Sequence, residues 1–310
     1  MKKTYKVIFS ILLVLGLLVA CGETKKATTA KIGVASTQKG FVTKDVNEIE
    51  FDTIVAGVAL VDDKVTYVSI DYSEQFADAK DGKVSATAIA TKKQRGADYG
   101  LKGASETTGL GKEWFEQIAG VEEGLIGKTL AEVKEYFAGE EILSAATIGL
   151  TEIELTVLKA FDNLTEVKDV SKVGLGYQVS MTVNQGKVAS VLEYAMLAVD
   201  SDEKIIKALL DTSEEKAEYI NDAWTAENVN QTKGELKEAY GMLVLSEIDK
   251  EWFEQTDSLM DYLQGKTFQE VLDLNDNASE DEDLKTSVTY TIGGTKAAIA
   301  HAKENLKSVK

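Results

Sequence analysis

An internal duplication is the feature that most constrains the fold of this chain. The sequence Lys-Glu-Trp-Phe-Glu-Gln occurs at residues 112–117 and returns unchanged at residues 250–255. In both places Gly-Lys-Thr begins fifteen residues after the start of the block. Collinear identity of this kind indicates one structural unit written twice. We therefore predict two tandem copies, repeat 1 at residues 31–165 and repeat 2 at residues 166–310.

Each repeat begins with the pattern of a β-hairpin. Residues 177–183 alternate apolar and polar side chains, which is typical of a strand with one buried face, and the turn Asn-Gln-Gly follows. In repeat 1 the strand-like residues 51–61 and 64–72 flank Asp62 and Asp63.

Helical patterns follow the hairpins. Thr129 and Thr267 each precede a Glu by three residues, which is a capping box at the start of a helix. Apolar periodicity predicts a last helix in each repeat, at residues 151–161 and 295–306, and we expect a further helical stretch over residues 201–240. Strands followed by helices without regular alternation indicate the α+β class, here two tandem copies of a small hairpin-plus-helices domain.

Composition excludes several classes of function. The net charge of −18 over 310 residues argues against nucleic-acid binding, which needs clustered Lys and Arg. One His and one Cys leave no His/Cys metal site, no disulfide and no Ser/His/Asp or Cys/His catalytic arrangement. We therefore assign no catalytic residue and no metal ligand from the sequence.

The N-terminus has the pattern of a lipoprotein signal. Three lysines precede an apolar run at residues 7–19, which is too short to span a bilayer but suits a secretory signal. The run ends in Leu-Val-Ala-Cys-Gly, which resembles the bacterial lipobox, and its Cys21 is the only cysteine of the chain. The resemblance implies cleavage after residue 20, acylation of Cys21 with long chains such as palmitate, and anchoring in the lipid bilayer on the extracytoplasmic face. Residues 21–30 read as a polar tether; a plain signal peptide is the alternative.

A short polar segment before the last helix of each repeat carries a second motif. Residues 141–147 read Glu-Ile-Leu-Ser-Ala-Ala-Thr and residues 283–289 read Asp-Leu-Lys-Thr-Ser-Val-Thr. Both are similar to the flavinylation motif of the FMN-binding domain family, which runs roughly Asp, two variable residues, Ser or Thr, Gly or Ser, Ala and Thr; Glu141 and Val288 depart from it. The motif positions are Glu141, Ser144 and Thr147 in repeat 1, and Asp283, Thr286 and Thr289 in repeat 2.

The resemblance implies that a separate flavin transferase attaches FMN through its phosphate to Thr147 and Thr289. Thr289 is the preferred acceptor because its motif keeps the Asp, whereas repeat 1 has Glu141 in its place. The protein would then be a non-catalytic electron carrier between a membrane redox donor and acceptors outside the cell. Two alternatives stay open: that both segments are ordinary strands, and that the protein is a cofactor-free binding or structural lipoprotein.

Overall fold

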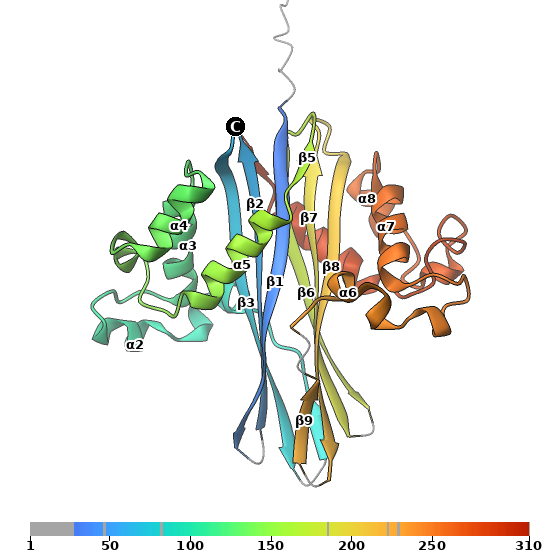
Figure 1. Ribbon diagram of the computed structural model, residues 1–310, viewed down its shortest axis with the longest axis horizontal. Coiled ribbons are helices and arrows are strands. Elements are labelled where there is room, and N and C mark those ends of the chain that lie inside the picture. The colour runs from blue at the N-terminus through green and yellow to red at the C-terminus, as the bar shows by residue number, and fades with distance from the viewer. Residues whose placement is uncertain are drawn as a thin grey trace, which may run out of the picture.

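The chain folds into four layers, two β-sheets packed face to face with helices on both outer faces (Figure 1). The computed structural model describes residues 28–45, 48–80, 83–184, 186–221, 223–227 and 230–309. The predicted α+β class is confirmed, with one five-stranded antiparallel sheet in each of two similar halves. The signal segment and Cys21 lie outside the described residues. In the described part no helix is long and apolar enough to cross a membrane.

Each sheet has the same topology. The first sheet has the order β4-β3-β2-β1-β5 and the second the order β10-β6-β7-β8-β9, so that β1 to β5 correspond to β6 to β10 in turn. The strands of the first sheet are β1 (Ala30–Asp45), β2 (Glu48–Val61), β3 (Lys64–Lys80), β4 (Lys83–Ala86) and β5 (Thr165–Val167). Those of the second are β6 (Lys172–Asn184), β7 (Lys187–Val199), β8 (Ile205–Ile220), β9 (Ala223–Glu227) and β10 (Lys307–Ser308).

The helices also correspond between the halves. Repeat 1 contributes α1 (Lys92–Arg95), η1 (Gly96–Tyr99), α2 (Lys102–Thr107), α3 (Trp114–Leu125), α4 (Leu130–Ala138), η2 (Glu141–Ser144) and α5 (Thr151–Asp162). Repeat 2 contributes α6 (Lys233–Leu236), η3 (Lys237–Tyr240), η4 (Leu243–Leu245), α7 (Trp252–Leu263), α8 (Phe268–Leu272), η5 (Ala278–Glu280) and α9 (Gly293–Glu304). The predicted capping boxes are present: Thr129 starts α4 and Thr267 starts α8.

The predicted helical stretch over residues 201–240 is wrong, because most of it forms the strands β8 and β9. Its polar run at residues 211–216 has a helical composition, but the strand buries polar side chains against the other sheet. Ser213 hydrogen-bonds Ser36, and the Thr53 hydroxyl donates to Glu215 at 2.6 Å. Tertiary contacts therefore override local propensity here.

Three apolar layers hold the four structural layers together. One lies between the first sheet and α3 to α5, another between the second sheet and α7 to α9, and the third between the two sheets. Polar bonds join the sheets as well, since the Tyr67 hydroxyl accepts from the Leu175 N–H at 2.8 Å and the Tyr177 hydroxyl donates to Asp71. The two repeats therefore share one central core.

Candidate functional site

An open pocket of about 540 Å³ lies on the outer side of the first sheet. The sheet forms its floor, and the segment from α1 to α3 and the start of α5 form its walls. Its apolar lining residues are Ile54, Tyr99, Leu101, Trp114, Ile148 and Ile153. Its charged lining residues are Lys39, Glu50, Asp52, Glu74, Lys92 and Glu152.

Thr147, the predicted acceptor of repeat 1, lies at the edge of this pocket, directly before the lining residues Ile148 and Gly149. Its side chain is exposed, and its N–H donates to Oε1 of Gln117 at 2.8 Å. Gln117 closes the repeated six-residue block and is fully buried, and its Nε2 donates to Ser105 and to the carbonyl of Lys112. The repeated block therefore positions the motif threonine.

The same arrangement recurs in repeat 2. The N–H of Thr289 donates to Oε1 of Gln255 at 2.8 Å, and its hydroxyl donates to the same oxygen at 3.1 Å. Residues 144–147 and 286–289 lie in turns and in the short helix η2, so the alternative prediction that they are strands is wrong.

The other predicted motif residues are exposed. Ser144 donates to the carbonyl of Glu141 inside η2, and Asp283 accepts a hydrogen bond from the Tyr262 hydroxyl at 3.0 Å. Glu141, Asp283 and Thr286 all have exposed side chains. These residues lie in the turn before each threonine, and Gln117, Thr108 and Gln255 make polar contacts with the two threonines.

In repeat 2 the position equivalent to the pocket is filled by side chains. The residue after the motif threonine is Ile148 in repeat 1 and Tyr290 in repeat 2. The Tyr290 ring packs on Trp252 with 5.9 Å between centroids, and its hydroxyl lies 2.8 Å from that of Thr256. Burial raises the pKa of Tyr290 well above its ordinary value. A pocket of only about 140 Å³ remains nearby, beside Lys233 and Tyr240.

The first turns of α5 and α9, the last helix of each repeat, also have different surroundings. Val55 pairs with Asp71 and Tyr194 with Asp211, so the preceding residues Ile54 and Glu193 are equivalent. In repeat 2 the Glu193 carboxylate accepts hydrogen bonds from the hydroxyl and N–H of Thr295, in the first turn of α9.

Gly294 makes room for this carboxylate, since a Cβ there would lie 1.5 Å from Glu193 Oε2. In repeat 1 the start of α5 faces the pocket instead, because Thr151, Glu152 and Ile153 line it and the N-cap residue Leu150 provides no side-chain cap. An anionic group therefore occupies the helix start in repeat 2, and the equivalent place in repeat 1 opens into the pocket.

The Thr-Lys pairs that recur upstream of each block are explained by the structure. Thr91 and Thr232 cap α1 and α6, and their hydroxyls donate to the buried Asp71 and Asp211 at 2.5 Å. Lys92 lies 3.7 Å from the centroid of the Tyr72 ring and forms an ion pair with Glu74 at 3.0 Å. The burial of Trp114 and Trp252 is consistent with a core role in each half.

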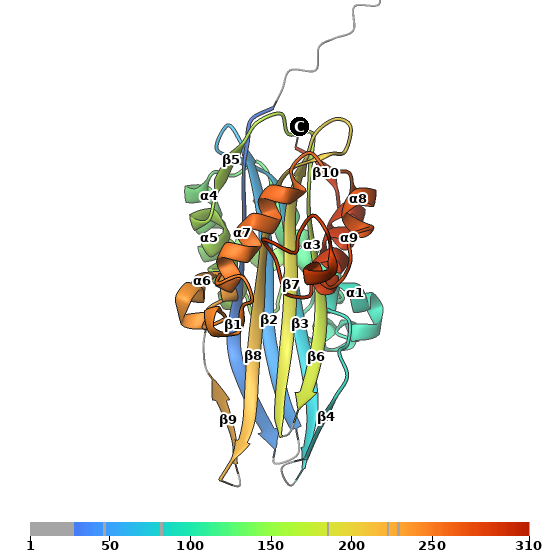
Figure 2. The same cartoon turned by 90° about the vertical axis from the view of Figure 1, so that its right-hand side faces the viewer.

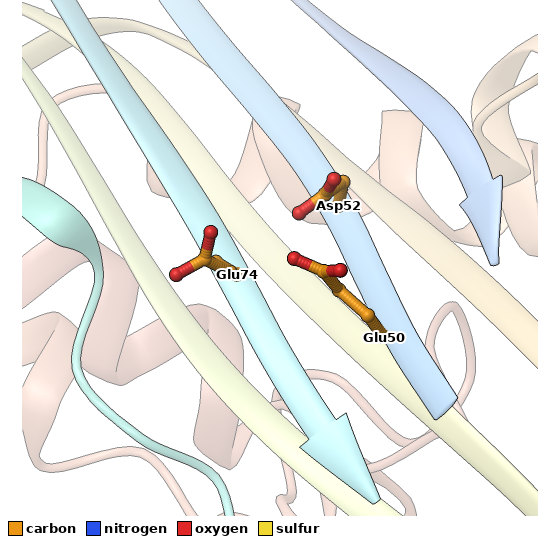
Figure 3. Close-up of side chains that lie close together, drawn as sticks. All are labelled: Glu50, Asp52 and Glu74. Atoms are coloured by element: carbon orange, nitrogen blue, oxygen red, sulfur yellow. The ribbon is translucent and has the colours of Figure 1, made fainter. Parts of the chain in front are cut away.

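Sequence reasoning missed a group of three carboxylates in the pocket. Glu50 and Asp52 alternate on β2, and Glu74 is the partner of Asp52 on β3. Figure 3 shows the three side chains close together, two on β2 and one on the neighbouring β3. The Glu-x-Asp spacing on a strand was the available signal, but the third carboxylate comes from the neighbouring strand.

Comparison with known proteins gives one partial match. No family model matches the chain, and no solved structure matches it. A stretch of 59 residues is 42% identical to a protein named chlorophenol reductase from Desulfitobacterium hafniense. This stretch covers 19% of the present chain and 17% of that protein.

Proposed function

We propose that the protein is a lipid-anchored extracytoplasmic electron carrier in which repeat 1 holds one FMN, attached through its phosphate to Thr147. The observation that carries this proposal is the position of the Thr147 hydroxyl. The residue is exposed, its N–H is bound by Gln117, and it directly precedes the pocket residues Ile148 and Gly149, four residues before α5. The 59-residue match is too short to transfer the activity in that relative's name.

The pocket suits the two chemical parts of FMN. The isoalloxazine ring is flat and largely apolar, and the partly exposed side chains of Tyr99, Leu101 and Ile148 offer surfaces on which it could pack. A phosphate ester on Thr147 would lie four residues before α5, whose first N–H groups and dipole favour a negative group, whereas Glu152 and Glu154 in the same turn oppose it. Covalent attachment keeps the cofactor on a protein outside the cell, and a flavin supplies redox chemistry that the side chains lack.

Repeat 2 does not offer the same space beside Thr289. Tyr290 packs on Trp252, and the Glu193 carboxylate lies at the start of α9, so the space that repeat 1 would offer to a ring and a phosphate is filled in repeat 2. The proposal therefore assigns one flavin per chain, at Thr147, in place of the Thr289 preference that the motif alone suggested.

The proposed anchor would attach at one end of the sandwich. β1 starts at Ala30 at the end where the C-terminus lies, and the long hairpins extend toward the opposite end (Figure 2). A chain acylated at Cys21 is tethered through this end, and the flavin lies on the side of the body. The partners in this proposal are a flavin transferase that loads Thr147 and a membrane redox donor that reduces the flavin.

Mass analysis of protein purified from its native host tests the proposal. We expect a yellow protein in which the peptide containing Thr147 carries one FMN less water. Thr147→Val keeps the side-chain shape and removes the acceptor hydroxyl, so the flavin should be lost. Thr289→Val is the matched control and should keep a full flavin load.

A native-host preparation without flavin on either peptide would reject the electron carrier. The protein would then be a cofactor-free binding lipoprotein, an alternative that the charged residues lining the repeat 1 pocket favour. Flavin on Thr289 alone would reject the assignment to repeat 1.

A further inference from the structure

Three of the charged residues that line the repeat 1 pocket are carboxylates that come within reach of a single ion. One oxygen from each of Glu50, Asp52 and Glu74 lies within 4.8 Å of the others (Figure 3). Two oxygens on opposite sides of a calcium ion are about 4.8 Å apart, since each Ca–O distance is about 2.4 Å. The spacing therefore matches oxygens that surround one cation.

Asp52 has a buried oxygen that lacks a hydrogen-bond donor. The residue is 8% exposed and lines the pocket, and within the described part of the chain its Oδ1 accepts no hydrogen bond. The Tyr72 hydroxyl bonds to the Asp52 carboxyl, and burial together with the charge of Glu50 raises the Asp52 pKa. A buried polar atom of this kind is expensive unless a ligand satisfies it.

The nearby positive side chains are placed mainly at Glu74. Lys92 and Arg95 approach its two oxygens at 3.0 and 3.8 Å. Lys39, from an exposed position, and Lys92 also act on Asp52 through their charges. Within the described part of the chain neither lysine forms an ion pair with Asp52.

We infer that Glu50, Asp52 and Glu74 bind one divalent cation at the floor of the repeat 1 pocket, with Ca²⁺ the preferred ion. All three ligands are hard carboxylate oxygens, and water from the open side of the pocket completes the coordination. Ca²⁺ accepts irregular arrangements of six to eight oxygens, whereas Mg²⁺ demands near-octahedral geometry.

Repeat 2 is an internal control for this site. Glu214 occupies the position of Glu74, but its partner across the strands is Val191, where repeat 1 has Asp52. The residue two positions before Val191 is Ala189, where repeat 1 has Glu50. One carboxylate remains of the three, so only repeat 1 should bind the ion.

Calorimetric titration of chelator-treated protein with calcium chloride tests the inference. The protein is made in a host without a flavin transferase, so that no flavin is attached. We expect one ion per chain and at least a tenfold loss of affinity in Asp52→Asn. Glu214→Gln is the matched control and should bind as the unaltered protein does.

Three outcomes would overturn the inference: no calcium binding up to about 10 mM, above the range of extracellular calcium modules; unchanged affinity in Asp52→Asn; or an equal loss in Glu214→Gln. Urea unfolding of each variant establishes that it is folded. If Asp52→Asn does not fold, Glu50→Gln replaces it in the same titration. Because the flavin is absent throughout, failure here leaves the flavin proposal standing, and Thr147→Val should leave calcium binding intact.

Discussion

Glu215 is a carboxyl group buried between the two sheets, where water is largely excluded from it. It is 4% exposed, and one of its oxygens accepts from Thr53. Within the described part of the chain the other oxygen has no hydrogen-bond partner. Burial raises its pKa to about 8, with a smaller contribution from Asp52. The folded protein therefore holds a proton on Glu215 at pH 7 that the unfolded chain has released.

This buried carboxyl predicts a pH-dependent stability. Because the folded-state pKa is raised, the free energy of unfolding should fall as pH rises from about 4.5 to about 8, each pKa unit contributing up to about 1.4 kcal/mol. Urea unfolding at pH 6 and pH 9 measures the slope. Glu215→Gln stays neutral and should flatten the curve across this window; a curve as steep as that of the unaltered protein would contradict the assignment.

Replacing Gln117 should lower the stability of the protein. Its side chain bonds to Ser105, to the Lys112 carbonyl and to the Thr147 N–H, all from a fully buried position. Gln117→Ala leaves these groups without their partner and should lower the free energy of unfolding by about 1–3 kcal/mol. Gln269→Ala, at an exposed position of α8, should change it by less than about 0.5 kcal/mol. Equal effects of the two changes would count against a positioning role for Gln117.

At the scale of elements, two glycines let the last helices pack closely on the sheets. A Cβ on Gly33 in β1 would lie 2.1 Å from the carbonyl oxygen of Ala160 in α5. Gly174 in β6 lies in the same relation to Ala302 in α9, at 2.3 Å. Asn163 and Asn305 then bond back to strand carbonyls, which fixes the helix ends.

Gly33→Ala should therefore push α5 away from its sheet. We expect a loss of about 1–3 kcal/mol in the free energy of unfolding, as for other overpacked cores. Gly103→Ala, inside α2 where a Cβ meets nothing within 4 Å, is the control and should stabilise by about 0.4–1 kcal/mol. Thermal unfolding of the two variants side by side gives the comparison, and the packing argument fails if Gly33→Ala melts no earlier than the unaltered protein.

The elements that sequence predicts well are those set by local chemistry. Thr129 and Thr267 start helices through contacts within one turn, and the hairpin at residues 177–197 follows from alternation and a turn. β8 was missed because its polar side chains are buried by the opposite sheet. The motif threonines are recognisable in sequence, but the difference between their surroundings is not. It depends on Glu193, Gly294 and Tyr290, which come together only in the folded protein.

At the scale of the whole molecule, the inner faces of the two sheets bury each other. The layer between them contains Ile32, Val55 and Tyr67 from one repeat and Leu175, Tyr177 and Met196 from the other. Neither repeat covers this face by its own helices, which lie on the outer sides (Figure 1). A repeat separated from its partner would expose this whole apolar surface to water.

Cutting the chain between β5 and β6 tests this dependence. Residues 28–168 expressed alone should not give a folded monomer, and should dimerise or aggregate. Co-expression with residues 169–310 should restore a soluble one-to-one complex that elutes with the intact protein in size-exclusion chromatography. A folded, monomeric repeat 1 would show that the central layer is dispensable.

The shared central layer also bears on how such a chain arises. A single repeat would need a second copy of itself to cover this face, which would give a symmetric homodimer with two equal pockets. Joining two copies in one chain makes the pairing permanent and removes the requirement that both copies stay alike. One copy is then free to fill its pocket, as Tyr290 and Glu193 do, while it continues to support the other. Repeat 2 is in this sense a built-in scaffold subunit.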